Sequence, residues 1–152
     1  MKVSDYLRED FCIKDLKSDN KEDAIKEIVD SLDKSGKLLD KDKFISDILE
    51  RENLGSTGIG NGIAIPHART NAVRGFIVGF GKSNPGIDFK SLDGNKVNLV
   101  FLMGADPSEL NLYLRLLAEL SKLLMNSYFR QSLLSAKNTS EIIEAIRKFE
   151  NV

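Results

Sequence analysis

The sequence predicts a three-layer α/β/α domain, with a mixed β-sheet covered by helices on both faces. Two observations support this fold class. Short apolar strands occur among amphipathic helices, which is typical of layered α/β proteins. Residues 97–103 form an almost continuous apolar run of strand length, as expected of a central strand covered on both faces. The length of 152 residues suits a single domain with one core, which we take to be residues 1–152.

The N-terminal third predicts a strand and two helices. A short helical turn is expected around residues 3–7, and the alternation in residues 11–16 predicts a strand. Apolar residues recur at helical spacing over 21–32, after capping side chains at 18–20, and Gly36 suits a left-handed helix end. Asp40 is placed to cap a second helix that ends near residues 51–53.

The middle of the chain predicts a glycine-rich loop followed by strands. The loop covers residues 55–62, and a short buried strand at 62–65 ends at Pro66. A further strand is expected at 75–80, before turns at 84–86 and 93–94.

The C-terminal part predicts three helices. Ser108 can cap a helix over 109–125, and a second helix starts at Ser127 and reaches residue 134 or 136. Asn138 and Glu141 resemble a capping box that opens the last helix. The leucines of the first of these helices are expected in the core, namely Leu110, Leu114, Leu117, Leu120 and Leu124.

Charge and composition exclude several classes of function. Lys and Arg total 22 against 23 Asp and Glu, so no basic excess points to nucleic acid or an anionic membrane. There is no apolar run of about 18 residues, as a membrane-spanning helix needs. The N-terminus lacks the apolar core of a signal peptide, and the lone Cys12 cannot form an intrachain disulfide. A cytoplasmic location is therefore expected.

Unusual chemistry is concentrated in residues 55–69, which hold the only histidine and four of the eleven glycines. A loop rich in glycine can direct bare backbone N–H groups at a phosphate or another oxyanion. We expect this donor role for Gly58, Gly60 and Asn61, with hydroxyl donors from Ser56 and Thr57.

Two further side chains complete the expected site. Arg51, at the end of the preceding helix, can supply a guanidinium fork for phosphate. The neutral imidazole of His67 is a good nucleophile toward phosphorus near neutral pH. The pattern therefore favours phosphoryl transfer through a phosphohistidine.

Other interpretations of the same residues are open. The stretch lacks the Gly-Lys-Ser/Thr end of a Walker A loop, and its glycines precede a strand, unlike the dinucleotide-binding fingerprint. His67 could be structural, Arg51 an ordinary helix-end cation, and the glycines a tight turn. Ser56 or Thr57 with His67 and Asp88 could form a hydrolase triad, but no nucleophile elbow is present. One histidine and a distant cysteine do not make a metal site.

A family resemblance adds to this interpretation. Residues 51–67 read Arg51-Glu-Asn-Leu-Gly-Ser-Thr-Gly-Ile-Gly-Asn-Gly-Ile-Ala-Ile-Pro-His67, which resembles the signature of enzyme IIA of the bacterial phosphotransferase system. The class is the fructose/mannitol class, which includes the nitrogen-regulatory type. Residues 113–120 resemble the family's His-Leu-x-x-Leu-x-x-Leu helix, and the resemblance covers essentially the whole chain.

The resemblance implies a cytosolic phosphocarrier with a mixed sheet, no metal and no cofactor. It implies that His67 accepts a phosphoryl group on Nε2 from HPr or a nitrogen-branch HPr. The recipient would be a cysteine of enzyme IIB or, in signalling, a regulatory target protein. Arg51 matches the family's arginine. The family's second histidine is replaced here by Tyr113, with Asn111 as the rival position.

The partner-docking surface and the class of function are further expectations. We expect Ile63, Ile65 and Ala68 at the rim where a partner docks. The glycine motif, and the absence of a IIB or permease segment from these 152 residues, favour the nitrogen-regulatory type. The alternative is a dedicated fructose/mannitol-type component of sugar transport. Outside the family, the alternative is a non-catalytic oxyanion-binding module.

Overall fold

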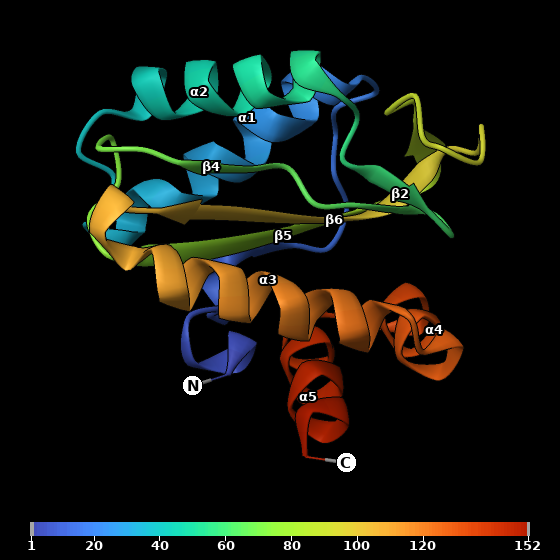
Figure 1. Cartoon of the computed structure of the whole chain (residues 1–152). Helices are drawn as coiled ribbons and strands as arrows, with labels where there is room; N and C mark the ends of the chain where they lie inside the picture. Colours follow the sequence, from blue (N-terminus) through green and yellow to red (C-terminus); the bar gives the residue numbers. More distant parts are fainter. Residues whose placement is uncertain (1, 152) are drawn as a thin grey trace.

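The computed structural model describes residues 2–151 and has the predicted three layers (Figure 1). A six-stranded mixed sheet forms the middle layer. Helices α1 (Lys21–Ser31) and α2 (Lys41–Leu54) cover one face. Helices α3 (Leu110–Leu124), α4 (Ser127–Ser135) and α5 (Thr139–Glu150) cover the other. The predicted fold class is confirmed.

The sheet is built around one long antiparallel pair. Its neighbours follow the order β1-β5-β6-β3-β2, and β4 pairs with β6 as well. Strands β5 and β6 are antiparallel to each other, whereas β1 runs parallel to β5, and β3 and β4 run parallel to β6. The strand bounds are β1 Cys12–Ile13, β2 Gly58–Gly60, β3 Ile63–Ala64, β4 His67–Arg69, β5 Phe76–Ile87 and β6 Val97–Ala105.

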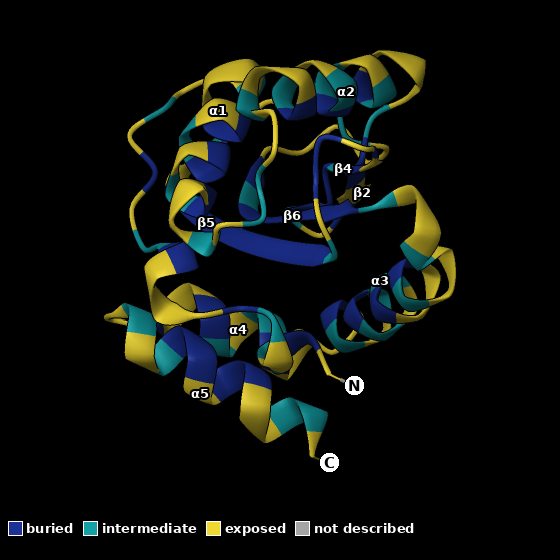
Figure 2. Cartoon of the chain, turned by 90° about the vertical axis from the view of Figure 1, so that its left-hand side faces the viewer, coloured by how far each residue is buried: buried dark blue, intermediate teal, exposed yellow. Residues whose placement is uncertain are grey.

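Strand β6 is the central strand, as its apolar sequence predicted. All of its residues except Asn98 are buried, and Figure 2 shows it in the interior between the helical layers. Helix α2 lies very close to it, since a Cβ built on Gly104 would be 2.5 Å from Cζ of Phe44. The predicted caps of the first layer are also present. The side chain of Asn20 accepts from the Asp23 N–H, that of Asp40 accepts from the Lys43 N–H, and Gly36 has a φ of 72°.

Several predicted strands differ from the observed ones. The first strand covers only two residues, because residues 9–11 form a 3-10 turn, η2 (Glu9–Phe11), beside the turn η1 (Val3–Asp5). The predicted turn at 84–86 lies within β5, at an irregularity of the pairing between Lys82 and Ile87. Pro85 fits there because proline has no backbone N–H to donate to a neighbouring strand, and the regular pairing is interrupted at this point.

The glycine stretch is a β-hairpin and not an open loop. Strands β2 and β3 pair antiparallel across Asn61 and Gly62, which have positive φ values of 57° and 76°. An Asn-Gly pair favours such a tight hairpin turn, and this signal was missed in the sequence. Strand β4 was also missed, because three residues are too short to show a period.

The C-terminal helices follow the prediction with two corrections. Helix α3 is preceded by the 3-10 turn η4 (Pro107–Glu109), where Asp106, and not Ser108, supplies the capping side chain. The leucine prediction was wrong in part. Leu120 and Leu124 are buried, but Leu110 is 41% exposed and Leu114 is 53% exposed. The inner face of α3 instead includes Tyr113 and Leu116. The first layer also contains the turn η3 (Leu32–Ser35).

Candidate functional site

The only histidine in the sequence, His67, follows a two-residue break between two short strands that pair with the same edge of β6. Strands β3 and β4 pair with β6 one after the other, at Leu99–Val100 and at Met103–Ala105. Ile65 and Pro66 separate them. The Ile65 N–H bonds to the carbonyl of Thr57 at 3.1 Å, and the Pro66 carbonyl accepts from the Met103 N–H at 3.0 Å. His67 therefore begins a strand that is fixed on β6.

The Ile65 carbonyl, in the break between β3 and β4, determines which nitrogen of His67 carries the proton. Its Nδ1 lies 2.7 Å from the carbonyl oxygen of Ile65. A carbonyl oxygen only accepts, so the hydrogen-bond network assigns the proton to Nδ1 and a lone pair to Nε2. Burial lowers the pKa of His67, the hydrogen bond to Ile65 opposes this, and the nearby charge of Arg51 lowers the pKa further. The ring is therefore a neutral nucleophile near pH 7.

His67 lines a hollow of about 620 Å³ at the meeting of α2, β4 and the start of α3. Three groups of residues surround the hollow: Lys43, Asp47, Glu50, Arg51 and Leu54 of α2; residues 67–71; and Pro107 and Tyr113. It therefore joins the predicted His67, Arg51 and Tyr113 in one place.

Two arginines contribute positive charge to this hollow. Arg51 lies in the last turn of α2, and its guanidinium donates to the Gly55 carbonyl at 2.9 Å. Arg69 follows His67 by two positions on β4, so the two side chains share one face of the strand while Ala68 is buried on the other. Sequence reasoning missed Arg69, although the same spacing on a predicted strand would have indicated it.

A third cation in the hollow is already paired. Lys43 lies 2.8 Å from the Asp47 carboxylate and 3.3 Å from the Thr70 hydroxyl, which itself donates to Asp47 at 2.5 Å. Burial alone would raise the pKa of Asp47, but the hydrogen bonds from Lys43 and Thr70 hold it below its usual value. Arg51 and Arg69 are therefore the better candidates to meet an added anion.

Tyr113 occupies the position beside the histidine. Its ring centroid is 5.8 Å from that of His67, and the side chain is buried. Asn111 is exposed and lies outside the residues that line the hollow. The structure thus selects Tyr113 over Asn111 as the neighbour of His67. Burial raises the pKa of Tyr113, against the opposing charges of Arg51 and Arg69, so its phenol stays protonated and can donate a hydrogen bond.

The expected cradle of loop donors is not arranged around His67. The Ser56 hydroxyl donates to the Phe89 carbonyl, and the Thr57 hydroxyl donates to the Glu52 carboxylate. The Gly58 N–H bonds to Ser56 Oγ at 2.9 Å, and the Asn61 N–H bonds to Asp93 at 3.1 Å.

Strand pairing explains this difference. Gly60 lies in β2 and pairs with Ile63, so these residues build the hairpin and none of residues 56–62 lines the hollow. The phosphoryl-binding roles expected of Ser56, Thr57, Gly58, Gly60 and Asn61 therefore have no geometric support in this structure.

Two further possibilities raised by the sequence have little or no support. Ile63 and Ile65 are buried and do not line the hollow, so they form no rim, whereas Ala68, also buried, does line it. Asp88 is exposed, its carboxylate accepts from the Lys90 N–H at 2.8 Å, and it does not line the hollow, so it forms no triad with His67 there.

Within residues 2–151, no group of three or more His, Cys, Asp or Glu side chains is arranged to hold a metal ion. Across the same residues, none of the helices combines the length and the apolar character needed to span a bilayer.

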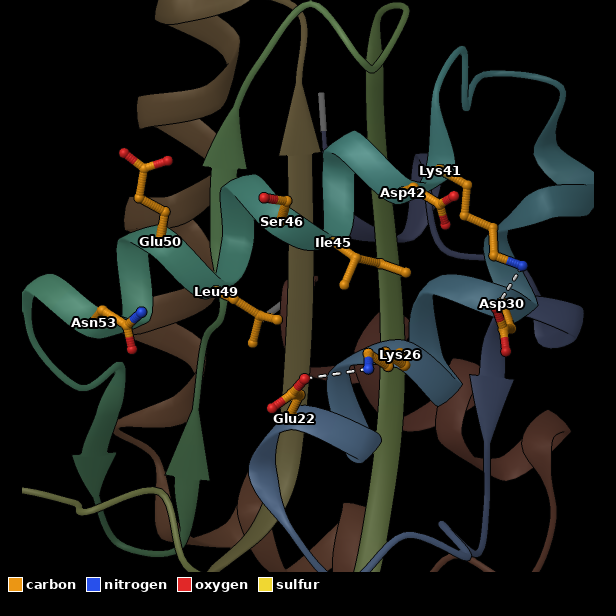
Figure 3. Close-up of a pocket in the computed structure, with 10 residues that line it drawn as sticks. All are labelled: Glu22, Lys26, Asp30, Lys41, Asp42, Ile45, Ser46, Leu49, Glu50 and Asn53. Carbon is orange, nitrogen blue, oxygen red and sulfur yellow. Dashed lines mark ion pairs between the residues drawn. The ribbon is translucent and has the colours of Figure 1, made fainter.

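A second hollow, of about 660 Å³, lies between α1 and α2 (Figure 3). Ile45 and Leu49 of α2 point toward α1 there. Its two lysines are paired with acids: Lys26 lies 3.2 Å from Glu22, and Lys41 lies 2.6 Å from Asp30. It contains none of the predicted site residues, so the hollow beside His67 is the candidate site.

Comparison with known proteins places the chain in a family. A family model described as "Phosphoenolpyruvate-dependent sugar phosphotransferase system, EIIA 2" matches residues 5–149. The chain belongs to this family. The family is one of phosphoryl carriers, and membership does not support a non-catalytic oxyanion-binding module.

The relatives of the chain include sugar-specific components and nitrogen regulatory proteins. The chain is 41% identical over 150 residues to the fructose-specific EIIABC component of Bacillus subtilis, covering 99% of this chain and 24% of that protein. It therefore spans about a quarter of that relative's length. It is 28% identical over 148 residues to a nitrogen regulatory protein of Bradyrhizobium diazoefficiens, covering 96% of this chain and 95% of that protein.

Solved structures show the same fold. The nitrogen regulatory protein IIA-Ntr of Neisseria meningitidis matches with a TM-score of 0.88 at 24% identity, over 95% of this chain and 98% of that one. The mannitol enzyme IIA of Escherichia coli, solved in complex with phosphorylated enzyme IIB, matches with a TM-score of 0.80 at 22% identity. That match covers 93% of this chain and 97% of the other.

Proposed function

We propose that this enzyme IIA carries phosphoryl groups on Nε2 of His67, in a phosphotransferase system of the fructose class. Phospho-HPr is the donor, and a cysteine of an enzyme IIB is the recipient. The observation that supports this proposal is the 2.7 Å contact of Nδ1 with the Ile65 carbonyl, which leaves Nε2 unprotonated in a hollow that Arg51 and Arg69 also line.

The transfer needs no proton to move. The Nε2 lone pair attacks the phosphorus, the P–N bond to the donor histidine breaks, and that imidazole keeps the electron pair. The phosphorylated ring of His67 retains its Nδ1 proton, held by the Ile65 carbonyl, and is then a cation. When the cysteine thiolate attacks phosphorus, the ring leaves as a neutral imidazole. A neutral leaving group departs readily, so the same hydrogen bond favours the second step.

Positive charge and one hydroxyl stabilise the transferring group. Phosphoryl transfer passes through a loose transition state, with charge spread over the three equatorial oxygens. The guanidinium groups of Arg51 and Arg69 meet this charge from α2 and β4, and the Tyr113 hydroxyl donates from α3. These groups are already in place, so little reorganisation accompanies the reaction.

Partner proteins dock around the hollow. Leu54, at the end of α2, is 83% exposed and lines it. Leu110 and Leu114 are exposed one turn apart on α3, beside Tyr113. Exposed apolar side chains near a reactive group are typical of a protein-binding patch. HPr and enzyme IIB would both approach this patch, in the cytoplasm.

Sequence identity is the reason for placing the fructose class first. The chain is 41% identical to the fructose-specific relative and 28% identical to the nitrogen regulatory one. The regulatory role favoured by the glycine motif is the second candidate, supported by coverage of 95% of the nitrogen regulatory relative. In that role a regulatory target protein would bind differently to the two phosphorylation states.

The test is phosphorylation with labelled phosphoenolpyruvate, enzyme I and HPr. Wild type should take up acid-labile label, and His67→Ala should take up none while keeping the wild-type circular dichroism spectrum. An unlabelled wild type, with an HPr that phosphorylates another enzyme IIA, would refute the proposal. Label that transfers to a fructose-class enzyme IIB supports the transport role. Label accepted only from a nitrogen-branch HPr, and not passed to enzyme IIB, supports the regulatory role.

A further inference from the structure

We propose that Glu52 is a positioning residue, which acts through Thr57 and the backbone of Ile65 to hold His67 in its Nδ1–H tautomer. The inference about the tautomer concerns the unphosphorylated protein. Its consequence for the transfer rate rests on the proposed function of His67.

The first observation is that the Glu52 carboxylate is buried, although burial removes the hydration that stabilises its charge. Glu52 lies in the last turn of α2 and is only 4% exposed. A buried carboxylate is destabilising unless it is paired and hydrogen-bonded. It accepts from both the N–H and the hydroxyl of Thr57, and Lys21 of α1 lies 3.4 Å away. Three donors from two other segments therefore converge on one acid.

The second observation is that Thr57 holds Ile65, the residue whose carbonyl orients the histidine. Thr57 is itself buried, and its carbonyl accepts from the Ile65 N–H at 3.1 Å. The Ile65 carbonyl then accepts from His67 Nδ1 at 2.7 Å. Ile65 lies in the gap between β3 and β4, so its N–H bonds to Thr57 and not to β6. Hydrogen bonds joined through the backbone of Thr57 and of Ile65 thus connect Glu52 to the ring.

Through these contacts Glu52 affects the tautomer of His67 by geometry as well as by charge. If Thr57 shifts, the backbone at Ile65 loses the hydrogen bond that fixes its N–H, its carbonyl can move, and Nδ1 loses its acceptor. The proton is then free to move to Nε2, where it blocks the lone pair that attacks phosphorus. Arg51 and Glu52 also bear on the ring by charge, and their effects on the pKa of His67 are opposite in direction.

The test uses the fact that the chain has one histidine, so its ring nitrogens can be assigned without ambiguity. Long-range ¹H–¹⁵N spectra of the unphosphorylated full chain report the tautomer directly. Wild type should give the Nδ1–H pattern. Glu52→Ala should shift the ring nitrogens toward a mixture of tautomers and slow phosphorylation about tenfold. Glu52→Gln, which keeps one acceptor for Thr57, should retain more of the Nδ1–H form.

The control is Glu22→Gln, which removes an exposed acid of α1 that pairs with Lys26. It should leave the spectrum and the rate unchanged. Wild-type spectra with the proton on Nε2 would overturn the inference without any variant. So would a folded Glu52→Ala protein whose ring nitrogens and rate both match wild type, or a Glu52→Gln protein with less of the Nδ1–H form than Glu52→Ala. If Glu52→Ala shifts the tautomer but wild type takes up no phosphoryl group, the inference stands and the proposed function fails.

Discussion

Arg51 and Arg69 line one hollow from different elements and are held differently. Arg51 is fixed by a 2.9 Å bond to the Gly55 carbonyl, whereas Arg69 makes a longer contact of 3.4 Å with the Pro107 carbonyl. We predict that Arg51→Gln slows phosphorylation by phospho-HPr about 100-fold, the order found when one preorganised donor is removed. Arg69→Gln should slow it about tenfold, because a less firmly held cation contributes less.

The matched control for both arginine variants is Arg74→Gln. Arg74 is exposed and donates to the Gly36 carbonyl at 3.1 Å, and it does not line the hollow. Rapid-quench measurement of the labelled protein gives the three rates. Equal rates for all three variants would show that the two site arginines are structural only.

Tyr113 is the residue of α3 whose ring lies 5.8 Å from that of His67, and it carries one hydroxyl. Tyr113→Phe removes only that hydroxyl, so it should slow phosphorylation about tenfold through one lost hydrogen bond to a charged group. The melting temperature should stay close to that of wild type, since the ring still fills its buried position. An unchanged rate would mean that the phenol does not reach the phosphoryl oxygens.

Acidification should affect the proposed acceptor only below its ordinary titration range. Burial and Arg51 lower the pKa of His67 in the folded protein, so the neutral ring persists below about pH 6.5. The unfolded chain takes up this proton first as pH falls. The neutral His67 ring therefore contributes to the free energy of unfolding above the pKa that it has in the unfolded chain. This contribution is lost as pH falls through the lower pKa of the folded protein.

Proton NMR titration of the single imidazole measures this shift. Arg51→Gln should raise the pKa of His67, because it removes an opposing positive charge, and Arg74→Gln should not change it. The phosphorylation rate of wild type should be level from pH 7.5 to about 6.5 and fall below that. A pKa of His67 in wild type above the ordinary histidine value would contradict the conclusion that the ring is neutral near pH 7, with a proton on Nδ1 and a lone pair on Nε2.

At the scale of elements, the helices were easier to predict than the strands. Asn20, Asp40 and Asn138 are local signals, and each caps its helix as expected. Strands β1 and β4 are two and three residues long and depend on pairing with distant strands, which no local period shows.

The same contrast applies to the candidate site. For His67 and Arg51 the residue type alone indicated the role, because an imidazole can accept a phosphoryl group and a guanidinium can bind one. The proximity of Tyr113 and the contribution of Arg69 depend on how α3 and β4 meet α2. The glycines were misread because their flexibility suits a hairpin turn as well as an anion-binding loop.

The packing of α2 on β6 leaves no space at Gly104. A Cβ there would be 2.5 Å from Cζ of Phe44 and 3.2 Å from Ile77. We predict that Gly104→Ala lowers the free energy of unfolding by about 1–3 kcal/mol, as overpacking of a core does. Gly94→Ala is a control with open space around it, although its φ of 75° adds some strain of its own. Urea denaturation measures both, and Gly104→Ala should be the less stable.

At the scale of the whole molecule, Cys12 reports on global opening. It is the only cysteine, it is buried in β1 beside β5, and burial raises the pKa of its thiol to about 12. Because only a thiolate reacts readily, a disulfide reagent at neutral pH should label native protein very slowly. The labelling rate should rise with urea in parallel with the unfolding transition. Rapid labelling of protein with a native circular dichroism spectrum would show that β1 opens locally.

The hollow beside His67 also limits the order of events in the proposed relay. One acceptor nitrogen beside one opening cannot face a donor and a recipient together, so each partner must dissociate before the other binds. Steady-state transfer should therefore follow ping-pong kinetics, with parallel lines in double-reciprocal plots. At concentrations above those that give parallel lines, unphosphorylated enzyme IIB should inhibit transfer in competition with phospho-HPr, because both dock beside the same unphosphorylated His67. The concentration of free carrier, and not the affinity of any ternary complex, then sets the flux through this step.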